Sequence, residues 1–92
     1  MKNNDLPTPH WTLAGGWEPI DERRGVRVEW PEGFDPASLP RPRHDLRERV
    51  RFRWKSHWRV GEVRDIKFAD QTLQYIIYTS GHGYWVGEDQ VE

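Results

Sequence analysis

The feature that most constrains this chain is the strict alternation of residues 49–54. Val50, Phe52 and Trp54 alternate there with three arginines. Because successive side chains of a β-strand point to opposite faces, the pattern predicts a strand with one buried face and one solvated face. The segment that follows, up to Val91, is interpreted as the antiparallel continuation of this strand.

Three more strands are expected downstream. Residues 60–68 hold valine, isoleucine and phenylalanine at uneven spacing, and a bulge near Gly61 would reconcile this spacing with a strand. A helix is the alternative, but the content of β-branched residues favours a strand. Residues 73–79 carry no charge and predict a central strand, and 84–86 predict a short last one. Turns are expected at the polar or glycine-containing segments between them and after the last strand: 70–72, 80–83 and 88–91.

This order of strands resembles the SH3-like small barrels, and in particular the Tudor and KOW-type domains. The resemblance rests on the basic-aromatic break at 55–57, on the segment Trp58-Arg59-Val60-Gly61-Glu62-Val63, and on two hairpins before a terminal turn. It covers about half of the chain. It implies a mainly β fold, with a small antiparallel SH3-like barrel at 46–92.

The first half of the chain predicts a less regular structure. Residues 1–10 are expected to be a disordered tail, and 11–45 an N-terminal β-arm with a proline-rich connection. Within the arm, 11–14 predict a short strand, and 17–20 and 25–30 predict a hairpin whose Val26, Val28 and Trp30 share a face. Proline removes backbone donors, so 31–44 are expected to be irregular, with one helical turn at 36–39.

The composition of the chain excludes several classes of protein. Ninety-two residues without cysteine predict a single domain with no disulfide and no zinc–sulfur site. No apolar run is long enough to span a membrane, and the first residues lack the apolar core of a signal peptide. We therefore expect a cytoplasmic protein that does not contact membranes.

The charge of the chain is close to zero overall but is strongly segregated. Residues 41–59 carry eight basic and two acidic side chains, whereas the segments on either side are net acidic. Arginines beside exposed aromatic rings suit an acidic protein surface or a nucleic acid. The alternative is a solvated strand face, neutralised by Glu62, Asp65 or Glu29 across the strands. The candidate partner-binding residues are Arg49, Arg51, Arg53, Lys55, His57, Trp58, Arg59, Tyr78 and Tyr84.

The aromatic residues allow two readings. In a Tudor-like barrel, Trp58, Tyr78 and Tyr84 are the rings nearest the loops that form a cage for a methylated side chain. The other reading places the rings in the core, because a domain this small needs large buried side chains. Core positions are favoured for Trp54, Tyr75 and Trp85.

Enzymatic chemistry finds little support in the sequence. The four histidines have no metal-ligand spacing, and there is no nucleophile elbow or phosphate-binding loop. The barrel also resembles that of plasmid-encoded dihydrofolate reductases, but Tyr84-Trp85-Val86-Gly87 stands where that family has a Gln-Ile-Tyr-type segment. We expect neither catalysis, nor a cofactor, nor a bound metal.

The sequence therefore predicts a non-catalytic interaction module. It would present a basic, aromatic surface to an acidic protein partner, in the manner of a small accessory or inhibitor protein. The alternative is a nucleic-acid-binding barrel of the KOW or Tudor type. A third reading is a homo-oligomer in which the arm buries Trp11, Trp17 and Trp30 against another copy.

Overall fold

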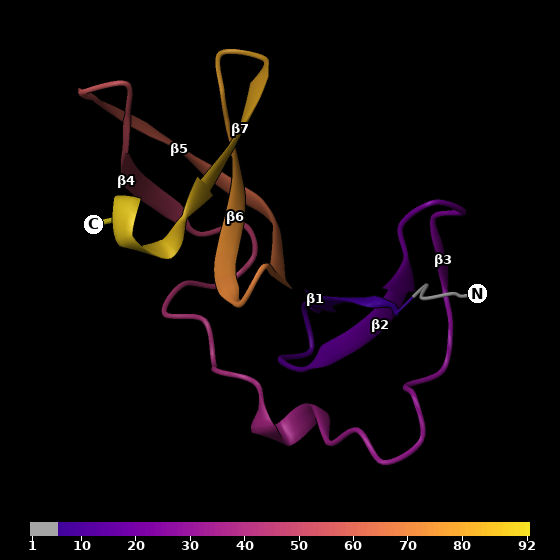
Figure 1. Cartoon of the computed structure of the whole chain (residues 1–92). Coiled ribbons are helices and arrows are strands. Elements are labelled where there is room, and N and C mark those ends of the chain that lie inside the picture. Colours follow the sequence, from indigo (N-terminus) through magenta and orange to yellow (C-terminus); the bar gives the residue numbers. More distant parts are fainter. Residues whose placement is uncertain (1–5) are drawn as a thin grey trace.

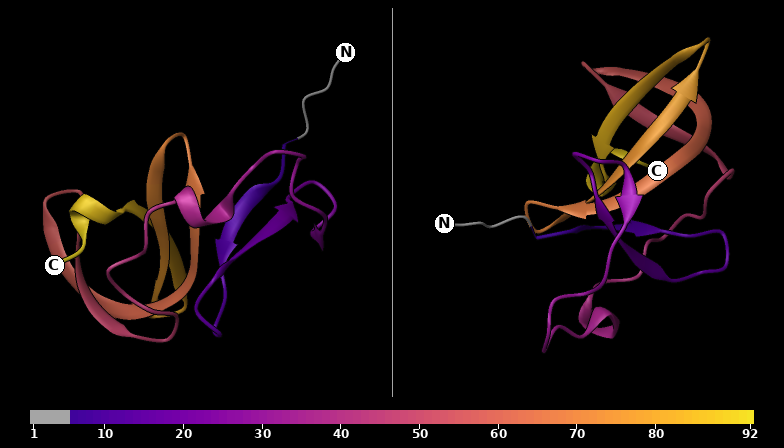
Figure 2. Two further views of the ribbon diagram at one scale, coloured as in Figure 1. Left: turned by 90° about the horizontal axis from the view of Figure 1, so that it is seen from below. Right: turned by 90° about the vertical axis from the view of Figure 1, so that its right-hand side faces the viewer.

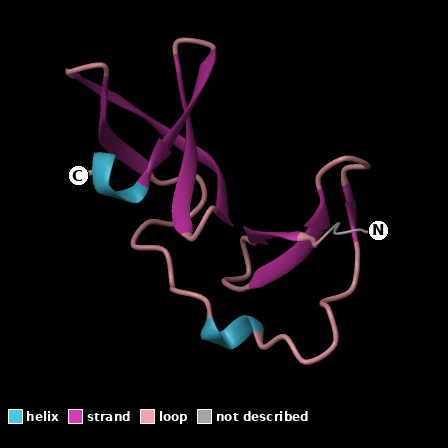
Figure 3. Ribbon diagram, viewed as in Figure 1, coloured by secondary structure: helices cyan, strands magenta, loops and turns pink. Residues whose placement is uncertain are grey.

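The computed structural model describes residues 6–92, and it is mainly β, with one antiparallel sheet of seven strands (Figures 1 and 3). Two short 3₁₀ turns interrupt the connections. No helix within the described residues is long and apolar enough to cross a bilayer. The elements in chain order are β1 Thr8–Trp11, β2 Trp17–Asp21, β3 Val26–Arg27, η1 Pro36–Ser38, β4 Arg49–Trp54, β5 His57–Ala69, β6 Thr72–Thr79, β7 His82–Gly87 and η2 Glu88–Gln90.

Strand β5, which is 13 residues long, joins the two halves of the chain. One edge of β5 pairs with β4 through residues 57–62 and then with β1 at Lys67, while the other edge pairs with β6. The sheet runs in the order β3-β2-β1-β5-β6-β7, with β4 off this path, and it is not closed. Because the N-terminal strands continue along β5, they lie at one end of the molecule and the β4–β5 turn at the other (Figures 1 and 2).

Three two-residue turns fix the register of strands β4 to β7. Their central residues are Lys55-Ser56, Asp70-Gln71 and Ser80-Gly81, and all six have positive φ, between 50° and 82°. Positive φ at both positions defines the type I′ turn, whose twist matches that of the flanking strands. The predicted turns at 70–72 and 80–83 are confirmed, each tighter than expected because the strands extend to Thr72 and His82.

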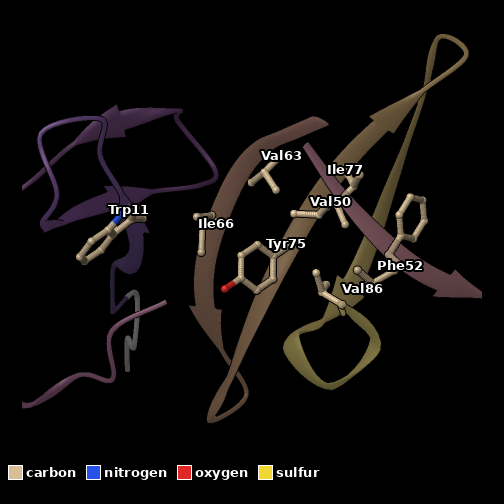
Figure 4. Close-up of a cluster of buried hydrophobic side chains, with 9 residues drawn as sticks. Trp11, Val50, Phe52, Val63, Ile66, Tyr75, Ile77 and Val86 are labelled. Atoms are coloured by element: carbon tan, nitrogen blue, oxygen red, sulfur yellow. The ribbon is translucent and has the colours of Figure 1, made fainter. Parts of the chain in front are cut away.

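The core lies inside the curved sheet, and both halves of the chain contribute to it (Figure 4). Trp11 of β1 belongs to the same cluster as the buried side chains of β4 to β7, and its ring packs edge-on against Trp17. Complete burial of an aliphatic or phenylalanine side chain stabilises a fold by about 1.5–3 kcal/mol. The buried members of the cluster are Trp11, Val50, Phe52, Val63, Ile66, Tyr75, Ile77, Val86 and Val91.

The end of the chain folds back on β4. After η2, Val91 forms an isolated β-bridge with Phe52, and the backbone N–H of Glu92 donates to the carbonyl of Arg51. The side chain of Arg43 donates to the carbonyls of Glu88 and Val91, at 3.0 Å each. The prediction that Val91 lies on the core is therefore confirmed, and the connection before β4 is tied to the C-terminal turn.

Several predictions for the first half need correction. Residues 8–10, which we predicted to be disordered, belong to β1; residues 1–5 lie outside the described residues. The strand predicted at 11–14 ends at Trp11, because the chain turns at 12–16. The strand predicted at 25–30 is only Val26–Arg27, and Val26 is exposed. The irregular connection and its helical turn are confirmed by η1, which Asp35 caps.

The position of the bulge in β5 was also wrong. Gly61 lies in regular pairing opposite Val50, and the register shifts between Val63 and Asp65. A Cβ atom at position 61 would lie 2.5 Å from the carbonyl oxygen of Tyr78. Glycine is therefore required here by the close approach of β6. The bulge at residue 64 accounts for the spacing between the buried Val63 and Ile66, whereas Val60 faces outward.

Candidate interaction face

The register between β4 and β5 builds the candidate surface. Arg53 lies opposite Trp58, and Arg51 lies opposite Val60. Directly opposite residues in an antiparallel pair project from the same face, so the arginines of β4 share the outer face of the sheet with Trp58 and Val60. We call this surface the basic-aromatic face; it consists of Arg49, Arg51, Arg53, Trp58, Val60, Arg64 and Tyr78, with one acidic residue, Glu62, between Arg49 and Tyr78.

A basic side chain of the protein lies over each exposed aromatic ring on this side of the sheet. The guanidinium carbon of Arg51 lies 4.4 Å from the ring centroid of Trp58, and that of Arg64 lies 4.9 Å from the centroid of Tyr78. Further along the outer side, the Lys67 ammonium lies 4.4 Å from the centroid of Trp85. Cation–π contacts at exposed sites are worth about 0.5–1 kcal/mol each, so they orient the rings without burying them.

The basic-aromatic face keeps unneutralised charge. Arg51 pairs with Glu92 at 3.0 Å, and Glu62 pairs with Arg64 on its own strand. Within residues 6–92, no carboxylate forms an ion pair with Arg49 or Arg53. Of the three carboxylates predicted across the strands, Glu62 does lie directly opposite Arg49, although its ion pair is with Arg64. Asp65 bonds His10 instead, and Glu29 lies in the connection after β3.

Four predicted site residues gather at the turn between β4 and β5, away from the outer face. Tyr84 packs edge-on against Trp54, at a centroid distance of 5.1 Å, and Arg59 lies over the Tyr84 ring. Lys55 lies 6.0 Å from the ring centroid of Trp54, and His57 is exposed at the start of β5. The turn is therefore a second basic and aromatic cluster, contiguous in sequence with the basic-aromatic face.

The aromatic cage expected from the Tudor resemblance does not form from the predicted rings. Trp58 and Tyr78 project from the outer face, whereas Tyr84 packs against Phe52 at the end of the core. A guanidinium of the chain itself also lies over each of the three rings. The rings therefore belong to two surfaces of opposite orientation.

A separate polar cluster connects β1 to β5. His10 bonds Asp65 through Nδ1 at 3.0 Å and Glu22 through Nε2 at 2.8 Å, and Lys67 lies 3.6 Å from Glu22. Burial disfavours protonation of His10, but the bonds and charges of Asp65 and Glu22 outweigh it and raise the pKa of the imidazole. No group of His, Cys, Asp or Glu side chains in the described part of the chain could hold a metal ion.

The sequence located some of the aromatic residues correctly and missed others. Tyr75 is fully buried, as predicted, and Trp54 packs partly buried against the core. Trp85, also predicted to be core, is 39% exposed because it faces outward opposite Ile76. We did not predict roles for Arg64 or Lys67, since only the bulge and the strand pairing decide which rings they reach.

Comparison of the chain with protein families, with curated proteins and with solved structures finds no match in any of the three. The geometry of the surface therefore carries the functional argument by itself.

Proposed function

We propose that the protein is a non-catalytic interaction module whose basic-aromatic face binds an acidic protein surface. One observation carries the proposal. Neither Arg49 nor Arg53 forms an ion pair with a carboxylate in the described chain, although Glu62 lies opposite Arg49, and the two arginines flank Trp58 and Val60, which are 47% and 46% exposed. Exposed apolar anchors beside unpaired cations fit a partner that offers carboxylates around an apolar cleft.

We also propose that residues 46–92 are an SH3-like barrel that is closed only by the isolated bridge between Phe52 and Val91. The support is the element order β4, β5, β6, β7, η2 and then Val91, which bridges back to Phe52. A 3₁₀ turn before a strand that returns to the first strand is the order expected for such a barrel. In this proposal the module acts in the cytoplasm, as a small accessory or inhibitor protein.

A nucleic-acid-binding function is the second candidate. The observation in its favour is the arrangement of Arg51 over Trp58 and of Arg64 over Tyr78, since bases stack on exposed rings and on guanidinium planes. Glu62 and Glu92 lie beside the same arginines and would repel phosphates and the carboxylates of a protein alike. The acidic protein surface is our first choice because the exposed Trp58 and Val60 offer it apolar anchors.

The test is a binding titration with two classes of labelled probe. One is a glutamate-rich peptide that contains a leucine anchor; the other is single-stranded and duplex DNA. We would use salt concentrations of about 50 and 200 mM, where phosphate contacts lose most of their affinity. The variants are Arg53→Glu and Trp58→Ala, with Arg27→Glu as the control, because Arg27 is an exposed arginine on the distant strand β3.

The proposal expects the peptide to bind, and both face variants to weaken binding at least tenfold while Arg27→Glu does not. Binding of DNA alone, lost between the two salt concentrations and in Arg53→Glu, would establish the second candidate instead. Absence of binding to either probe would overturn both.

A further inference from the structure

An apolar groove lies between the N-terminal strands and the end of β5. Its volume is about 190 Å³, and its walls include Leu6, Pro9, Trp30, Pro31, Phe34 and Phe68. Trp30 and Phe34 stack with their ring centroids 5.1 Å apart, and both rings line the groove. Leu6 and Phe34 are exposed although both are apolar.

Two acidic side chains lie close in sequence to the stacked aromatic pair. Glu29 and Glu32 are exposed on the segment that carries Trp30 and Phe34. In residues 6–92 no lysine, arginine or histidine forms an ion pair with either carboxylate. Each of these glutamates is next in sequence to a residue that lines the groove, so an occupant meets an apolar floor close to two carboxylates without an ion pair, which favours a basic segment with an apolar anchor.

The chain itself presents such a segment at the opposite end of the molecule. The turn between β4 and β5 places Lys55 at its centre and Arg53 opposite the exposed ring of Trp58. The molecule is 41 Å long, and this turn lies at the end opposite the N-terminal strands (Figures 1 and 2). The turn therefore cannot reach the groove of its own chain, whereas it is free to reach that of another copy.

We propose that the β4–β5 turn of one copy binds in the apolar groove of a second copy. This inference rests on the proposed function, because it identifies the acidic arm of a second copy as one partner of the basic surface. The two contacting surfaces differ, so the contact is heterologous and leaves one turn and one groove free in each pair. The contact is small, so the association is weak and dependent on concentration and salt.

Complementary variants test this arrangement. Glu32→Arg alters the groove and leaves the turn intact, whereas Arg53→Glu alters the turn and leaves the groove intact. We would measure mass by sedimentation at protein concentrations between about 10 and 500 µM, at about 50 and 500 mM salt, since weak small interfaces are populated only at the upper end. Asp89→Arg, on η2, is the control for a change of charge elsewhere.

The wild type and Asp89→Arg are expected to exceed the monomer mass at low salt only. Each groove or turn variant alone is expected to remain monomeric, and an equimolar mixture of the two to associate again. A monomeric wild type, single variants that still associate, or a mixture that does not would each overturn the proposal.

The experiments distinguish failure of the groove proposal from failure of the proposed function. Glu32→Arg leaves the basic-aromatic face unchanged, so it is expected to bind the glutamate-rich peptide like the wild type. If self-association is absent but the peptide binds, the groove proposal fails alone. If neither the peptide nor a second copy binds, both the groove proposal and the proposed function fail.

Discussion

The hydroxyl of Tyr75 donates a 2.6 Å hydrogen bond to the carboxylate of Glu88, which joins the centre of β6 to the turn η2. The same hydroxyl accepts a bond from the backbone N–H of Arg43, at 3.1 Å. Burial of the ring, followed by the bond and charge of Glu88, raises the pKa of the phenol, so it remains a donor at neutral pH. Three segments far apart in sequence therefore depend on one oxygen atom.

Replacement of Tyr75 by phenylalanine is expected to lower the free energy of unfolding by about 2 kcal/mol, the usual value of a hydrogen bond to a charged group. Urea denaturation measures this change. Tyr78→Phe removes a hydroxyl from an exposed ring and is expected to change stability by less than about 0.5 kcal/mol. Equal midpoints for the two variants would contradict the role of the hydroxyl.

Gly61→Ala is expected to destabilise the fold by about 3 kcal/mol, since overpacked positions lose this much when backbone must move. The new Cβ would lie 2.5 Å from the Tyr78 carbonyl oxygen and 2.8 Å from Ile77 Cγ2. Gly16→Ala, where no atom lies within 4 Å, is the matched control and is expected to be neutral or slightly stabilising. A thermal melt of each variant tests the difference, and a Gly61 variant as stable as the control would refute the steric argument.

His10 is expected to make the attachment of β1 dependent on pH. Its pKa in the folded protein is raised above the ordinary value of 6.5, so protonation of His10 stabilises the folded state. This stabilisation is fully present at pH values below 6.5. The contribution is lost as pH rises through the higher pKa of the folded protein. We therefore expect the free energy of unfolding and the protection of the Trp11 amide from hydrogen exchange to fall as the pH rises above about 6.5.

The imidazole bonds Asp65 on β5 and Glu22 after β2, and these two carboxylates raise its pKa, while Lys67, opposite His10 in the register, pairs with Glu22. His10→Gln is expected to flatten the profile, whereas His57→Gln, at an exposed histidine, retains it. The lowered pKa values of Glu22 and Glu48 affect stability only at more acidic pH. Parallel profiles for wild type and His10→Gln would exclude the histidine as the source.

Gln71→Gly is expected to raise stability by about 1 kcal/mol, because a non-glycine residue in the left-handed region is strained by this amount. Gln71 has a φ of 62° in a type I′ turn, and the change produces the favoured Asp-Gly pair. For a domain of this size the melting temperature would rise by about 4–8 °C. The reverse change Gly81→Gln, at a φ of 82°, is expected to lower it, and a lower melting temperature for Gln71→Gly would contradict the assigned turn.

The candidate surface could be predicted from sequence only in part. The alternation at 49–54 placed three arginines on one face and Phe52 in the core, as the structure has them. The partners of those arginines were not predictable, because pairing between distant residues decides them. Arg51 binds Glu92 only because the last residues return to β4, a contact between positions 41 residues apart.

The sequence by itself determined the strands of the second half and the turns between them, because the period-two alternation and the turn residues act over short distances. It also determined the segregation of charge. Only the tertiary structure decided that Trp11 enters the core, that Trp85 faces outward, and that Tyr84 lies apart from Trp58. The reason is that strand register and the bulge at residue 64 assign each side chain to a face, and both are set by pairing with strands that local sequence does not identify.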